Sequence, residues 1–117
     1  MRLGDKEYTL KYTYNALAEY EARYSRSLIK DISAGGYLPV RRLIFAGLMH
    51  YKDPTITENA VGEMIEKELE TGEKDLIDLK KEISDALNDA VFIQRLTERT
   101  RARRAASLER SGNPSGD

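Results

Sequence analysis

A chain of 117 residues, of which 40% are apolar, is long enough for one small domain with one modest core. It contains no cysteine, which excludes disulfide bonds, thiolate metal sites and cysteine nucleophiles and fits a reducing compartment. No apolar run approaches the roughly 20 residues that span a bilayer, and residues 1–10 lack the apolar centre of a signal peptide, so we expect a cytoplasmic protein rather than a membrane or secreted one.

The net charge of −1 conceals an uneven distribution of charge. Acidic residues outnumber basic ones by 17 to 13 in residues 1–94, whereas residues 95–110 carry six arginines against two glutamates. An acidic body is therefore followed by a basic segment, and the two parts favour different partners.

The first predicted element is a β-strand. Tyr8, Leu10 and Tyr12 alternate with polar residues over 7–13, which places aromatic and apolar side chains on one face. The Gly4-Asp5 pair can turn a short preceding strand back against this one, and such a hairpin needs a helical layer to cover it.

Two helices are predicted next. From about Asn15 the apolar residues recur every three or four positions, which indicates a helix that carries Tyr20 and Tyr24 on its apolar stripe. A short second helix follows a serine cap and ends at Gly35 and Gly36, where two glycines favour a turn.

A third helix is predicted from Pro39, a residue suited to the first helical turn, to about Tyr51. Its segment LIFAGLMHY, residues 43–51, is the longest apolar stretch of the chain and is apolar around most of its circumference, so we expect it in the middle of the fold. Gly47 within it would allow close helix packing.

A fourth helix is predicted to start after the cap residue Thr57 and to end at Gly72. A last long helix of about five turns or more begins near Asp75 and carries an apolar stripe that runs to Ile93. We interpret this last helix as an interaction helix.

The predicted fold is therefore mainly α: a small helical domain of about five helices with a short N-terminal β-strand or hairpin. We place the domain at residues 1–98. Residues 99–117 form a basic C-terminal tail that we expect to be flexible, although its alanines and arginines could prolong the last helix.

The residues that could carry chemistry have simpler explanations. His50 is the only histidine, and the chain offers no further nitrogen or sulfur ligands for a zinc site, so we interpret it as a packed or surface residue. Gly35 and Gly36 are followed by Tyr37 and Leu38, without the spacing or the lysine of a phosphate-binding loop. We predict no catalytic residue, no metal site and no cofactor.

Four carboxylates of the last helix share one face and could in principle hold a divalent cation: Asp78, Glu82, Asp85 and Asp89. We interpret this face as solvated. It could also attract a basic partner, including the arginine-rich tail of a neighbouring subunit.

In chain order, these signals resemble the tail assembly chaperones of long-tailed (siphovirus-like) phages and prophages. The resemblance covers most of residues 8–93, and its matching segments are YTYNALAEYEARY (12–24), SLIKDI (27–32), LPVRRLIFAGLMHY (38–51), DPTITENAVGEMIEK (53–67) and DALNDAVF (85–92).

The resemblance implies a non-enzymatic protein of the host cytoplasm that binds the helix-rich tape-measure protein and keeps its apolar stretches soluble. The protein would leave as tail-tube subunits polymerise. The implied partners are the tape-measure protein and, through a frameshifted longer form where one exists, the tail-tube protein. We expect neither a nucleic acid nor a membrane as partner. The family brings no catalytic or binding residue that can be transferred to this chain.

Candidate contact residues therefore come from physical reasoning. Six are predicted at or near a partner or self-association surface, because their helices carry broader apolar stripes than so small a domain buries; they are Tyr20, Tyr24, Leu76, Leu79, Ile83 and Leu87. We accordingly expect a homo-oligomer. Four arginines of the tail are predicted for an electrostatic contact, namely Arg99, Arg101, Arg103 and Arg104.

Two other function classes stay open. One is a structural head or tail connector subunit. The other is a small nucleic-acid-binding phage protein that uses the arginine-rich tail to neutralise phosphates, although no aromatic residue stands among these arginines for stacking on bases.

Overall fold

The computed structural model describes the backbone of residues 1–111 and the side chains of residues 1–106. The elements, in chain order, are β1 (Arg2–Leu3), β2 (Lys6–Glu7), α1 (Tyr14–Tyr24), α2 (Leu28–Asp31), α3 (Tyr37–Leu48), the 3-10 turn η1 (Met49–Tyr51), α4 (Glu58–Thr71), α5 (Leu76–Asn88) and α6 (Val91–Ser111). The mainly helical fold with an N-terminal hairpin is confirmed. The described residues form six α-helices rather than about five, because the last predicted helix is divided into α5 and α6.

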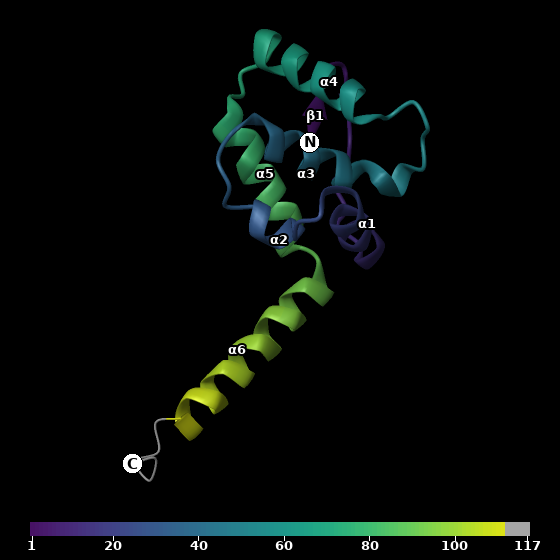
Figure 1. The fold of residues 1–117 in the computed structure, drawn as a ribbon. Coiled ribbons are helices and arrows are strands. Elements are labelled where there is room, and N and C mark those ends of the chain that lie inside the picture. Colours follow the sequence, from purple (N-terminus) through teal and green to yellow (C-terminus); the bar gives the residue numbers. More distant parts are fainter. Residues whose placement is uncertain (112–117) are drawn as a thin grey trace.

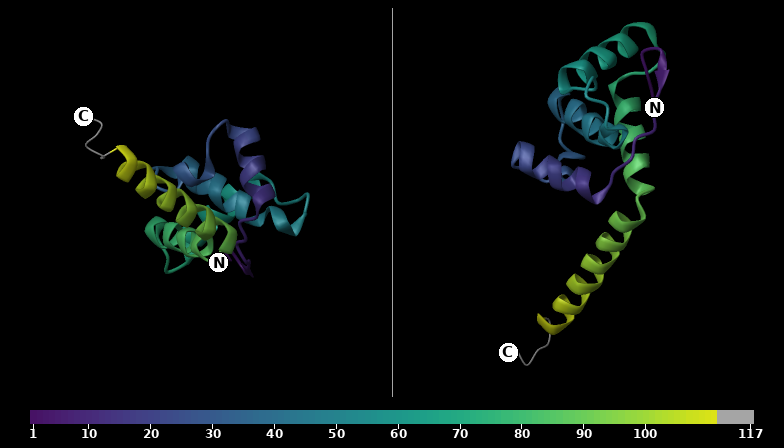
Figure 2. Two further views of the ribbon diagram at one scale, coloured as in Figure 1. Left: turned by 90° about the horizontal axis from the view of Figure 1, so that it is seen from below. Right: turned by 90° about the vertical axis from the view of Figure 1, so that its right-hand side faces the viewer.

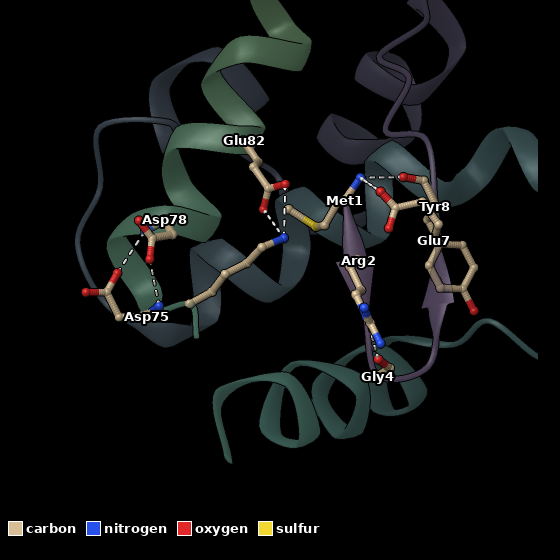
Figure 3. Close-up of polar contacts among 9 residues, drawn as sticks. Met1, Arg2, Gly4, Glu7, Tyr8, Asp75, Asp78 and Glu82 are labelled. Carbon is tan, nitrogen blue, oxygen red and sulfur yellow. Dashed lines mark hydrogen bonds and ion pairs between the residues drawn. The ribbon is translucent and has the colours of Figure 1, made fainter. Parts of the chain in front are cut away.

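The N-terminal hairpin is short and antiparallel. Arg2 pairs with Glu7 and Leu3 with Lys6, which leaves Gly4 and Asp5 as a two-residue turn. The α-amino group of Met1 donates a 2.6 Å hydrogen bond to the carbonyl of Tyr8, beyond the end of β2 (Figure 3). The hairpin lies against α4, where Leu3 is buried.

The strand predicted over residues 7–13 is wrong in extent but right in its alternation. Residues 8–13 are extended without a strand partner, since their main chain runs along α3 rather than along a sheet, and Lys11 N–H donates to the carbonyl of Gly47 at 2.9 Å. Tyr12 is nevertheless buried, and Thr9 is exposed. The apolar face of this segment therefore faces the core, as the sequence indicated.

Helix α3 is the centre of the body. Residues 43–48 are all buried, and α3 contacts α1, α2, α4 and α5. In Figure 1 and in the right-hand view of Figure 2, α4 lies on one side of α3 and α1 on the other. The predicted central position of LIFAGLMHY is confirmed for residues 43–48. Helix α3 ends at Leu48 rather than near Tyr51, and in η1 Met49 and His50 are half-buried and Tyr51 is exposed. The helix begins at Tyr37, two residues before Pro39. Its N-cap residue, Gly36, adopts φ +100°, which lies outside helical geometry and which residues with a side chain rarely adopt.

Gly47 permits a close approach, but to the extended N-terminal segment rather than to another helix. A Cβ atom at this position would lie 2.9 Å from Leu10 Cδ2 and 3.0 Å from Tyr12 Cζ. The hydroxyl of Tyr12 donates to the carbonyl of Leu43 at 2.8 Å, which anchors the ring against α3.

The predicted ends of α4 and the start of α5 are confirmed. Thr57 accepts a hydrogen bond from the Ala60 N–H at 3.0 Å, and α4 ends at Gly72. Asp75 and Asp78 form a reciprocal capping box at the start of α5, with two hydrogen bonds of 2.9 Å (Figure 3).

The prediction of one continuous last helix is wrong. The chain leaves helical geometry around Asp89 and Ala90 and starts again as α6. No glycine or proline marks this break. Ile93 packs partly against the core, whereas residues 94–106 are all exposed, so α6 projects from the body (Figure 1; Figure 2, right).

The domain boundary predicted near residue 98 falls inside α6, which runs without interruption from the body into the basic tail. Residues 99–111 are helical. The rest of the predicted tail, residues 112–117, lies outside the described residues.

Candidate interaction surface

Most of the residues predicted for a partner surface belong to the core. Tyr20 and Leu79 are 0% exposed, Ile83 1% and Leu87 4%. Leu76 and Tyr24 are half-buried and pack against the same core. The prediction of a surface position is therefore wrong for Tyr20, Leu79, Ile83 and Leu87.

The reason is the position of α5. We expected its apolar stripe to exceed what the domain could bury, but α5 packs against α3, which is apolar around most of its circumference. The apolar stripe of α5 is thus buried within one chain.

Tyr20 belongs to a buried polar cluster. Its hydroxyl donates to Oδ2 of Asp31 at 2.6 Å, and the Arg26 guanidinium donates to Oδ1 at 2.7 and 2.8 Å. Hydrogen bonding from Arg26 lowers the pKa of the Asp31 carboxyl despite the opposing effect of burial, while burial raises the pKa of Tyr20. Both carboxylate oxygens are occupied by protein donors, so the cluster ties α1 to α2 and leaves neither oxygen of Asp31 for a ligand.

An apolar groove lies between the first turns of α3 and the middle of α4. It has a volume of about 630 Å³ and is lined by Tyr37, Leu38, Arg41, Gly62, Ile65, Glu66, Leu69 and Glu70. Three large apolar side chains on it are open to solvent, since Tyr37 is 80% exposed, Leu38 44% and Leu69 37%. A cluster of exposed apolar side chains with charged neighbours is typical of a protein-binding surface.

The groove was missed in the sequence. In the sequence, Tyr37 and Leu38 stand out only as the residues that follow the glycine pair. The available signal was the presence of these two large apolar residues just before Pro39, in the first turn of a helix whose core-facing residues begin at Val40.

The four tail arginines lie on α6 and are exposed. Arg101 also lines a smaller hollow of about 300 Å³ between α2 and α6, together with Ile29 and Thr97. Within the part of the chain whose side chains are described, none of the four forms an ion pair with a carboxylate. They are available for an electrostatic contact, but the structure does not bring them to the groove.

The other candidate side chains have structural roles. Asp78 caps α5, and Glu82 pairs with Lys74 at 3.2 Å (Figure 3). The Nε2 atom of His50 lies 2.7 Å from the carbonyl of Thr9, and its ring packs on Tyr51. Over the described residues, no three side chains of His, Cys, Asp or Glu gather closely enough to hold a metal ion.

Within residues 1–111, no helix combines the length and the apolar character that a membrane crossing requires. Comparisons of the chain with protein-family models, with curated proteins and with solved structures find no match.

Proposed function

We propose that the protein is a non-enzymatic tail assembly chaperone of a long-tailed phage or prophage. It acts in the host cytoplasm, where it binds an apolar helical segment of the tape-measure protein and keeps that protein soluble until tail-tube subunits assemble around it. The binding surface is the groove between α3 and α4.

The groove is the observation that supports this proposal. It combines an open apolar lining with the carboxylates of Glu66 and Glu70. The volume of the groove, about 630 Å³, suits a few apolar side chains of one helix. The carboxylates keep the surroundings hydrated while the apolar side chains of a partner are covered. A chaperone needs this combination, because it must hold apolar segments without itself aggregating.

The family resemblance supports the same surface. Five of the eight lining residues belong to residues 38–51 and 53–67, which are two of the longer segments that resemble the tail assembly chaperones, whereas Tyr37, Leu69 and Glu70 lie just outside them. The buried residues of these segments pack the core of the domain. Leu38 is exposed and does not belong to the core, so packing does not account for an apolar residue at this position.

The proposal predicts that a gene for a tape-measure protein lies beside this one, and coexpression with that protein tests it. Size-exclusion chromatography with light scattering should show a soluble complex for the wild-type chain. Leu38→Glu and Leu69→Glu should abolish it, because each places a charge in the apolar lining of the groove.

Ile77→Glu is the matched control, because Ile77 is 74% exposed on α5 and does not line the groove. This variant should solubilise the tape-measure protein as the wild type does. An insoluble tape-measure protein beside an unbound wild-type chain would reject the proposed function.

Helix α6 favours a second candidate function, the binding of nucleic acid. Arg95, Arg99 and Arg103 recur every four residues along its exposed length, so they lie on one helix face and could neutralise successive phosphates. Binding of a DNA duplex with a steep salt dependence, lost in a chain that ends at residue 94, would support this candidate.

A structural connector would instead remain in finished virions.

A further inference from the structure

One arginine of the groove has an unusual environment. The Nε atom of Arg41 is buried, yet it has no hydrogen-bond partner among the described residues. A buried donor without an acceptor is unfavourable, and the guanidinium group cannot avoid this by losing its proton. Such a group calls for an explanation.

The other arginines of the body show how this protein normally treats the side chain. Each of the remaining four within residues 1–90 has a partner: Arg2 reaches the carbonyl of Gly4, Arg23 lies over the ring of Phe45, Arg26 pairs with Asp31, and Arg42 lies over the ring of Tyr24. Among these described arginines, Arg41 alone has neither an acceptor nor an aromatic face.

The groove brings Arg41 close to the backbone of α4. A Cβ atom at Gly62 would lie 3.4 Å from Arg41 Cδ, so the absence of a side chain at position 62 makes room for the arginine stem. Glu66 and Glu70 line the same groove, but neither forms an ion pair with Arg41 within 4.0 Å in the described structure. The half-buried side chain of Arg41 thus carries a buried Nε–H donor in the groove, without a carboxylate that accepts from it.

We propose that the α3–α4 groove binds an apolar helical segment of another protein that carries a carboxylate between its apolar side chains, and that this carboxylate accepts hydrogen bonds from Arg41. A basic side chain on the flank of the segment faces Glu66 or Glu70. The guanidinium group suits a carboxylate because it offers several donors in one plane. The inference rests on the proposed function only for the identity of the partner, the tape-measure protein.

Charge argues against helix α6 of a second copy as the occupant. This helix is exposed, and between Arg99 and Arg104 it presents four arginines. The nearest carboxylate, Glu98, precedes them. This helix would therefore bring mainly like charge to Arg41.

Two synthetic helical peptides of about 18 residues, the length of about five helical turns, provide the test. Both have leucine and alanine on the apolar face and lysine on the polar face. They differ at one central position of the apolar face, which is glutamate in one peptide and glutamine in the other. Calorimetric titration of the full-length protein should show about tenfold tighter binding of the glutamate peptide, the size expected for a hydrogen bond between charged groups.

Arg41→Gln should weaken binding of the glutamate peptide about tenfold and remove the preference between the two peptides. Arg95→Gln, which removes a positive charge from the exposed α6, is the matched control and should change neither affinity. Equal binding of the two peptides by the wild-type protein would overturn the inference, and this comparison does not depend on the folding of any variant. A preference that persists in folded Arg41→Gln would also overturn it.

The outcomes separate this inference from the proposed function. A protein that prefers the glutamate peptide but fails to solubilise the tape-measure protein keeps the inference and loses the function. A tape-measure protein solubilised equally well by wild type and Arg41→Gln keeps the function and overturns the inference. A dimer in light scattering that Leu69→Glu dissociates would assign the groove to a second copy and would also overturn the inference.

Discussion

The Tyr20 hydroxyl donates a 2.6 Å hydrogen bond to the carboxylate of Asp31, which is itself only 1% exposed. The bond joins α1 to α2 across a site from which water is excluded. Arg26 supplies the opposite charge from the edge of the body. The relationship explains how a charged residue can be buried in a domain this small, since hydrogen bonds and an ion pair replace the lost hydration.

Asp31→Asn should destabilise the protein in a pH-dependent way. The pKa of Asp31 is lowered in the folded state, so its ionised form stabilises the fold at pH values above the unfolded-state pKa, and this contribution is lost as the pH falls through the folded-state pKa. We expect Asp31→Asn to lose about 2 kcal/mol of unfolding free energy at pH 7. In urea titrations, the difference from wild type should shrink below about pH 4.

Asp85→Asn is the control for this prediction, because Asp85 is an exposed carboxylate on α5. It should change the unfolding free energy by less than about 0.5 kcal/mol. A difference between Asp31→Asn and wild type that stays constant from neutral to acidic pH would contradict the role given to the carboxylate.

Gly47→Ala should destabilise the fold by about 1–3 kcal/mol through overpacking. The new methyl group would lie 2.9 Å from Leu10 Cδ2, and the neighbouring Tyr12 ring cannot move away without disturbing its hydrogen bond to Leu43. Gly35→Ala is the matched control, since nothing lies within 4 Å of a Cβ atom there. Thermal unfolding of the two variants should therefore differ clearly, and equal midpoints would argue against the close approach.

Two charge substitutions on α5 distinguish its buried face from its exposed face. Leu79→Glu places a carboxylate at a position that is 0% exposed, whereas Ile77→Glu places one at a position that is 74% exposed. We expect Leu79→Glu to lose more than about 4 kcal/mol and to unfold most of the chain. Ile77→Glu should retain the circular dichroism spectrum and melting midpoint of wild type. A folded Leu79→Glu variant with altered self-association would restore the surface role first expected for this residue.

Removal of most of α6 should leave the body intact. A chain that ends at residue 94 loses only exposed side chains among those described, so its melting midpoint should stay within about 4 °C of wild type. Its helical circular dichroism signal should fall. A chain that ends at residue 89 also loses Ile93, which packs partly against the core, and should melt at a lower temperature. Equal midpoints for the two truncations would show that residues 90–94, Ile93 included, contribute nothing to stability.

The ends of several helices were predictable because capping is local. Thr57 bonds to an amide three residues away, and Asp75 and Asp78 bond to each other's main chain over the same spacing. The residues that make these bonds stand together in the sequence, so their pattern is visible without the fold. The central place of residues 43–48 was predictable for a related reason, since a helix that is apolar on most sides must be covered on most sides.

The break between α5 and α6 could not be predicted in this way. The apolar period continues through Ala90 to Ile93, and no glycine or proline interrupts it. A periodic pattern records which residues share a helix face, but it does not record a change in the direction of the helix axis. Because of this change in direction, residues 94–106 project from the body and are exposed.

The sequence by itself therefore determined the helical class of this protein, the N-terminal hairpin turn, the capped helix ends and the identity of the central helix. The tertiary structure alone decided which apolar stripes are used inside the domain. It buries Leu79, Ile83 and Leu87 on α5 and leaves Leu38 and Leu69 open beside Arg41 in the groove. The physical reason is that an apolar residue favours burial against any apolar surface, so its exposure depends on which helices pack beside it rather than on its own neighbours in the chain.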